Sequence, residues 1–120
     1  MDQAVKPLTW ILGLVLTLVG LLGFVMSSPL LGLFAVDSIH NVIHLLSGVI
    51  ALGAAATSSA YSRTYLMVFG VVYGLVTVLG FVQGDNVLQL ITVNPADNFL
   101  HLAIAAVCLI VGFGSTKNAA

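Results

Sequence analysis

Four long apolar stretches dominate the chain and restrict the folds that are open to it. Each is close to the 20 or so residues that a helix needs to cross a hydrocarbon core of about 30 Å. They run approximately over Leu8–Met26, Ile39–Ala56, Tyr65–Val82 and Ala96–Gly114. Inside lipid, backbone groups must find hydrogen-bond partners within the protein, and the strands of a closed barrel would alternate apolar with polar residues. The sequence therefore predicts an all-α integral membrane protein with four transmembrane helices.

Composition supports this prediction and excludes some partners. The 120 residues are 60% apolar and only 6% charged, whereas soluble domains have roughly 25% charged residues. Three Lys and Arg residues in the whole chain are too few to bind a nucleic-acid backbone, so no nucleic acid is expected as a partner. We expect a single membrane domain over residues 1–120 that is surrounded mainly by lipid.

A second feature is a motif that occurs twice, 57 residues apart. The string Asn41-x-x-His44-Leu45 returns as Asn98-x-x-His101-Leu102. The chain is therefore predicted to be a duplicated unit, with repeat 1 over about 7–58 and repeat 2 over about 64–115. Each unit contains two spans, so both copies insert in the same direction. We expect two tandem, like-oriented helical hairpins related by a pseudo-twofold axis along the membrane normal.

All basic residues fall on one side of this arrangement. They are Lys6, Arg63 and Lys117. The charged residues on the opposite side are all acidic, namely Asp37, Asp85 and Asp97. The positive-inside rule then places both termini and the loop Thr57–Thr64 in the cytoplasm. The two apolar loops on the outer side, Ser27–Val36 and Gln83–Val93, are expected to lie as short turns in the membrane interface.

Two predicted helix starts on the outer side set the depth of the histidines. Asn94 is followed by a proline at the first helical position and an acid at the third, and Asp37 is the predicted cap of the second span. His44 and His101 each lie seven residues beyond their cap, which is about 10 Å along the axis. Both are therefore expected just inside the hydrocarbon boundary.

Six polar residues near these helix starts form the candidate site: His40, Asn41, His44, Asp97, Asn98 and His101. If the pseudo-twofold axis brings the second and fourth spans together, all six converge near the outer surface. Three imidazoles and a carboxylate would suit zinc or another borderline divalent metal, with His40, His44, Asp97 and His101 as candidate ligands. His44 and His101 alone could instead be axial ligands of a haem or a chlorophyll-type pigment.

The same residues also have a purely structural interpretation. Asn and His at the start of a membrane helix often hydrogen-bond a neighbouring helix, so that no polar group is left without a partner in lipid. A duplicated structural contact explains the repetition as well as a ligand site does. Proton or pH sensing by the histidines is a third interpretation.

Small residues mark the candidate helix contacts. Gly13 and Thr17 align with Gly70 and Gly74, and Gly48 follows His44 by four residues. Such spacing lets helix backbones approach closely in membranes. The stripe containing Gly13 and Gly70 is a candidate for the contact between the two halves.

No pattern in the chain indicates an enzyme. Neither a nucleophile paired with a base nor a phosphate-binding loop is visible, and the middle of every span lacks the Asp, Lys or Arg that ion-coupled transport usually needs. We expect a non-enzymatic accessory or scaffold component that associates with other transmembrane subunits or with identical copies. A metal-, haem- or pigment-binding protein and a small transporter are the alternatives.

The repeated motif is also a family resemblance. The duplicated Asn-x-x-His-Leu, the Leu-Gly-Phe-Val that ends the first and third spans, and Asp97-Asn98-x-x-His101 resemble the small bacterial four-span membrane proteins of domain of unknown function 4383. The resemblance covers about 12–114. Members carry a glycine four residues after each histidine; Gly48 matches but Ala105 does not, which implies a looser backbone approach in the second half. The resemblance implies a four-span fold in a bacterial-type inner or internal membrane, and no known activity.

Overall fold

The fold consists of four long helices and a short β-ribbon. A computed structural model describes residues 1–116, so Lys117, assigned above to the cytoplasmic side, lies outside the described residues. The helices are α1 (Asp2–Val25), α2 (Ser38–Thr57), α3 (Ser59–Gln83) and α4 (Pro95–Gly114). All four are long and apolar enough to cross a membrane. The longest dimension of 40 Å is close to the thickness of a bilayer with its headgroups, about 40–45 Å. The prediction of an all-α architecture with four candidate membrane spans is confirmed.

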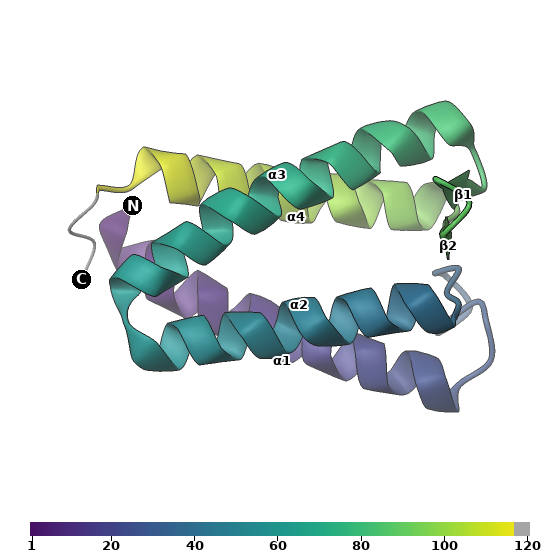
Figure 1. The fold of residues 1–120 in the computed structure, drawn as a ribbon, viewed down its shortest axis with the longest axis horizontal. Coiled ribbons are helices and arrows are strands. Elements are labelled where there is room, and N and C mark those ends of the chain that lie inside the picture. The colour runs from purple at the N-terminus through teal and green to yellow at the C-terminus, as the bar shows by residue number, and fades with distance from the viewer. Residues whose placement is uncertain (117–120) are drawn as a thin grey trace.

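The helices pack as two antiparallel hairpins, α1 against α2 and α3 against α4 (Figure 1). Less extensive contacts of α3 with α1 and α2 join the hairpins. The Asp2 carboxylate accepts hydrogen bonds from the backbone N–H and the hydroxyl of Thr116, at 2.8 and 2.6 Å. Arg63 Nε donates to Ser115 Oγ at 3.1 Å. The starts of α1 and α3 and the end of α4 therefore lie together, opposite the two longer loops.

The connection between α2 and α3 is shorter than the sequence predicted. Ser58 alone separates the two helices; its backbone N–H donates to Ala54 O at 3.1 Å, and its hydroxyl accepts from the N–H of Tyr61 at 3.0 Å. The predicted loop Thr57–Thr64 is therefore wrong, because α3 begins at Ser59. The hydroxyls of Ser62 and Thr64 bond to carbonyls one turn back, which satisfies these polar residues inside a helix. The first span also starts earlier than expected, at Asp2.

The two outer loops are more ordered than short turns. In the second loop, β1 (Asn86–Val87) pairs antiparallel with β2 (Ile91–Thr92), and in the first a single bridge joins Leu30 to Phe34. At aligned places in the two loops, Leu31 and Leu88 both have a positive φ, of 54° and 53°. Val87, Ile91 and Val93 are buried against side chains of α3. The ribbon is thereby anchored against α3 at the end of the bundle opposite the termini.

The candidate packing glycines lie inside the hairpins. A Cβ added at Gly13 would come within 2.7 Å of Leu52 on α2, and one at Gly70 within 2.9 Å of Leu109 on α4. Gly48 packs directly on the backbone and hydroxyl of Thr17 on α1, whereas a Cβ at Gly74 would meet nothing within 4 Å. This corrects the expectation that Gly13 and Gly70 join the two halves. Within each hairpin the helices pack closely over much of their length, so that is where a missing side chain is needed.

Candidate functional site

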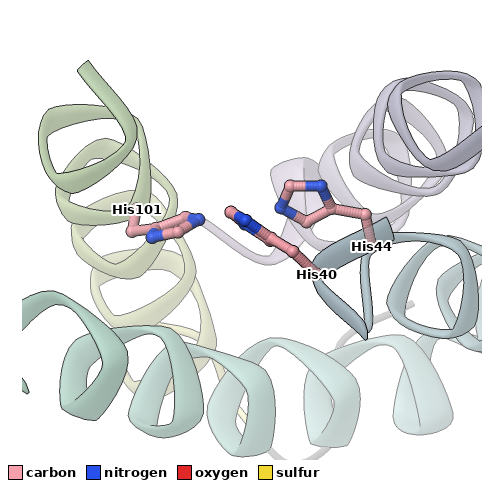
Figure 2. Close-up of side chains that lie close together, drawn as sticks. All are labelled: His40, His44 and His101. Atoms are coloured by element: carbon pink, nitrogen blue, oxygen red, sulfur yellow. The ribbon is translucent and has the colours of Figure 1, made fainter. Parts of the chain in front are cut away.

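The three histidines come together at the end of the bundle that carries the two longer loops. His40 and His44 on α2 and His101 on α4 point into the space between these two helices (Figure 2). Ring centroids are 4.3 Å apart for His40 and His44, 5.5 Å for His40 and His101, and 5.9 Å for His44 and His101. Each residue is at most 2% exposed. One ring nitrogen from each lies within 4.8 Å of the others, so the imidazoles form a single buried cluster.

The orientation of His40 is fixed by the β-ribbon. His40 Nδ1 lies 2.8 Å from the carbonyl oxygen of Thr92 on β2. Because a carbonyl can only accept, Nδ1 carries the hydrogen and Nε2 keeps its lone pair. A carbonyl that orients an imidazole in this way is the usual outer-shell partner of a metal-binding histidine. The lone pair of Nε2 is therefore available to a ligand.

Asp37 binds the other backbone group of the same residue, Thr92. Its Oδ2 accepts the backbone N–H of Thr92 at 2.6 Å, while its Oδ1 caps α2 by accepting the N–H of His40 at 2.8 Å. The predicted cap at Asp37 is confirmed. Both backbone groups of Thr92, which belongs to the second half of the chain, are therefore held by the first turn of α2.

The start of α4 makes the reciprocal contact. Asn94 caps this helix and forms a capping box with Asp97, as predicted. The side-chain N–H of Asn94 also donates to Leu33 O in the first loop, at 2.9 Å. Asn94 is the residue that aligns with Asp37. Each helix start therefore holds the outer loop of the other half, which fixes α2 and α4 relative to each other where the histidines meet.

Asp97 is not part of the histidine cluster. It is 0% exposed, but its Oδ2 accepts the N–H of Asn94 at 3.0 Å, and its carboxylate is not among the mutually close ligand atoms. Helical spacing put Asp97 on the same face as His101, but the capping box turns the carboxylate back toward the helix start. Among the described residues, the candidate ligands are the three histidines without the carboxylate.

Asn41 and Asn98 belong to the hairpins and not to the cluster. The Asn41 amide packs on Gly23 of α1 and the Asn98 amide packs on Gly80 of α3 so closely that a Cβ at either glycine would overlap the amide oxygen. This corrects the expectation that all six polar residues converge between α2 and α4. The two helices meet through histidine side chains and do not approach at the backbone.

The histidines surround a small cavity and leave ring nitrogens without partners. His40 Nε2, both nitrogens of His44 and Nδ1 of His101 form no hydrogen bond among the described residues. Buried polar groups are almost always paired, so this concentration is unusual. The cavity measures about 30 Å³ and is lined by His40, Ile43, His44, Val72, Tyr73, Val76, Ile91 and His101. Tyr73 was not predicted as a site residue, because a tyrosine within an apolar membrane helix carries no motif that marks it.

The dimensions suit a metal ion and exclude a macrocycle. Zinc binds imidazole nitrogen at about 2.0–2.1 Å, which places tetrahedral ligand nitrogens about 3.4 Å apart. The widest pair, within 4.8 Å, must therefore close by up to about 1.4 Å, a movement that ring rotation can supply. A cavity of about 30 Å³ is far below the roughly 300 Å³ or more of pockets that hold organic ligands. A haem or chlorophyll-type pigment does not fit between His44 and His101.

Comparison with known proteins gives one match. Residues 6–114 match the family model of a domain of unknown function, DUF4383, which confirms the resemblance seen in the sequence. No curated protein and no solved structure matches the chain.

Proposed function

We propose that this chain, which belongs to the DUF4383 family, is a membrane protein that binds a transition-metal ion through His40, His44 and His101. One observation carries the proposal: three buried imidazoles turn partnerless ring nitrogens toward one small cavity. Imidazole nitrogen is a preferred ligand of zinc, copper, iron and nickel, and three histidines are a common zinc-binding set. Zinc is the ion we expect.

The unpaired nitrogens favour a ligand over a purely structural role. A structural histidine in a membrane helix is retained because its ring bonds to neighbouring groups. His40 meets that description through Nδ1, but His44 has no partner at either nitrogen among the described residues. Leaving a buried acceptor or donor unpaired costs about 1–3 kcal/mol. A bound metal supplies the missing partner for one nitrogen of each ring.

Metal analysis of the purified protein tests this proposal. The protein is purified in mild detergent with a tag that contains no histidine, and its metal content is measured before and after addition of zinc. We expect about one zinc ion per chain in the wild type. His44→Ala or His101→Ala should lower zinc affinity by more than the ~10–100-fold typical of a lost outer-shell partner. Asp85→Asn, which changes an exposed residue outside the cluster, is the control. A folded wild-type protein that takes up no zinc, copper or cobalt would contradict the proposal.

We propose the same duplicated architecture that the sequence suggests: two like-oriented hairpins related by a pseudo-twofold axis along the membrane normal. Support comes from contacts that recur 57 residues apart, because Asn41 on Gly23 has its counterpart in Asn98 on Gly80. The caps Asp37 and Asn94 are a second such pair. Both termini are proposed to be cytoplasmic, in a bacterial-type inner or internal membrane.

A non-enzymatic accessory role is the second candidate function. The specific support is the outward apolar surface: only 28–39% of each membrane-length helical window is buried inside the chain. That surface is available to lipid, to identical copies or to other transmembrane subunits. Native gels in mild detergent test this role, and we expect a defined homo-oligomer or a larger complex. A monomer that migrates alone would speak against it.

A further inference from the structure

We infer that the metal centre keeps one coordination position for a small inorganic anion from outside the chain, and that the Tyr73 hydroxyl donates a hydrogen bond to it. This inference rests on the proposed metal-binding function. It assigns the site to one of two known kinds of zinc site. Structural zinc sites are closed by four protein ligands, whereas open sites have three protein ligands and exchange a small fourth ligand.

The cavity offers space for such a ligand and no fourth protein ligand. A water-sized occupant needs about 10–15 Å³ of cavity, and this cavity measures about 30 Å³. Apart from the histidines and Tyr73, its lining is made of Ile43, Val72, Val76 and Ile91, which cannot coordinate a metal. Asp97 binds its own helix start through Oδ2, and its carboxylate is not among the mutually close ligand atoms. Among the described residues, Tyr73 is the one other lining residue with a side-chain oxygen, and we assign it to the outer ligand and not to the metal, so the fourth ligand comes from outside the chain.

Charge favours an anion as this ligand. A divalent ion held by three neutral imidazoles keeps its full charge of +2. Burying a charge without compensation is costly in a protein interior and within a membrane. An anion such as hydroxide or azide halves the net charge, whereas water leaves it unchanged. No carboxylate of the described residues lines the cavity, so no acidic side chain among them stands beside the ion to balance its charge directly.

Tyr73 is placed to hold the anion. It enters the cavity from α3, on a different helix from any histidine, and its ring centroid lies 5.5 Å from that of His101. The residue is 3% exposed, and its hydroxyl has no hydrogen-bond partner among the described residues. A buried tyrosine hydroxyl usually has one. As an O–H donor beside the histidines, Tyr73 is a positioning residue for a metal-bound anion.

Azide titration of the cobalt(II)-loaded protein tests the inference. Cobalt(II) replaces zinc with similar ligands, and its visible absorption reports a change of ligand. We expect azide to shift the cobalt spectrum saturably. Tyr73→Phe should leave cobalt content and the azide-free spectrum unchanged, and weaken azide binding roughly 3- to 10-fold, the loss of one hydrogen bond. Tyr61→Phe, which alters an exposed tyrosine at the opposite end of α3, should change neither.

The outcomes separate this inference from the proposed function. Stoichiometric cobalt with a spectrum that azide does not change overturns the open position and leaves metal binding intact. Loss of cobalt from Tyr73→Phe also overturns it, because Tyr73 would then be a metal ligand itself. If the wild-type protein binds no cobalt, both the proposed metal binding and the open coordination position are contradicted. If Tyr73→Phe does not fold, the wild-type titration still decides whether the position is open.

Discussion

His40 occupies the position in the first half of the chain that Asp97 occupies in the second. The two aligned residues have different partners, since His40 contacts the Thr92 carbonyl across the interface and Asp97 accepts an N–H within its own helix start. In the proposed duplication, His44 and His101 are the matched pair, and His40 supplies the third imidazole at a position where the two halves differ.

Asp37 makes the joint between α2 and the β-ribbon sensitive to acid. Burial by itself raises the pKa of Asp37, but hydrogen bonds from the backbone N–H of His40 and from Thr92 outweigh it and hold this pKa below its ordinary value of 3.8. A carboxylate whose pKa is depressed by folding contributes stability above its ordinary pKa, and that contribution is lost as the pH falls through the folded-state pKa. We expect the wild type to lose stability below about pH 3.8, and Asp37→Asn to lose less.

The measurement is the midpoint of unfolding in detergent between pH 7 and pH 2. Asn remains a good N-cap, but its amide nitrogen cannot accept the N–H of Thr92. Asp37→Asn therefore loses that bond together with the charge at every pH, so what it tests is the slope of stability against pH and not the stability at pH 7. Asp85→Asn removes a carboxylate from the same side of the molecule and should leave the acid-induced loss of stability as in the wild type. Parallel pH curves for the wild type and Asp37→Asn would contradict the prediction.

At the scale of helices, the closest approach to a neighbouring backbone in the first hairpin is at Gly48. An added Cβ there would overlap the backbone nitrogen and hydroxyl of Thr17, and α1 can relieve the overlap only by moving away. Overpacking of this kind costs about 1–3 kcal/mol. We therefore expect Gly48→Ala to lower the free energy of unfolding by about that amount, measured by denaturant titration in micelles.

Gly53 provides the matched control on the same helix. A Cβ at Gly53 would meet nothing within 4 Å, so Gly53→Ala keeps only the gain in helix propensity, up to about 1 kcal/mol. The two substitutions are chemically identical and should differ in sign. Equal effects on stability would show that Gly48 does not mark a close helix contact.

Local signals in the sequence predicted the elements well where one residue type determines the structure. The caps Asp37 and Asn94 fixed the starts of α2 and α4, because their side chains bond to backbone groups only three residues away. The loop Thr57–Thr64 was mispredicted, because polarity suggested a loop while Ser62 and Thr64 bond back to their own helix. The β-ribbon gave no local signal, since its two-residue strands are held by burial against α3.

The candidate site was only partly predictable, because part of it depends on contacts that are distant in the sequence. Helical spacing put His40 and His44 on one face, and the repeat placed His101 opposite them. Spacing cannot tell which way a side chain turns, so it could not separate Asp97, which folds back to its cap, from His101, which enters the cavity. Tyr73 was not found because its role depends on how α3 crosses the other helices, which no short motif encodes.

At the scale of the molecule, the two hairpins are joined at both ends by polar contacts. On one side Asp2 binds Thr116. On the other, Asp37 binds Thr92 and Asn94 binds the first loop. Between these ends the contact is mainly apolar, with Leu16, Leu66 and Cys108 among the most buried residues. The arrangement keeps these polar contacts at the two ends of the bundle and places the histidine cavity next to those of Asp37 and Thr92.

The charge distribution predicts which end of this molecule faces the cytoplasm. Lys6 and Arg63 lie near the end at which Arg63 contacts Ser115, and the ribbon with Asp85 lies at the other. The positive-inside rule assigns the basic end to the cytoplasm.

Single cysteines at Thr57 and Asp85, both exposed, can test this orientation with a membrane-impermeant maleimide. The native Cys108 is 0% exposed and gives little background. We expect Thr57→Cys to react only in inverted membrane vesicles and Asp85→Cys only in spheroplasts. Reaction of both from one side would contradict the four-span topology, and reversal of both would show that the topology holds with the opposite orientation.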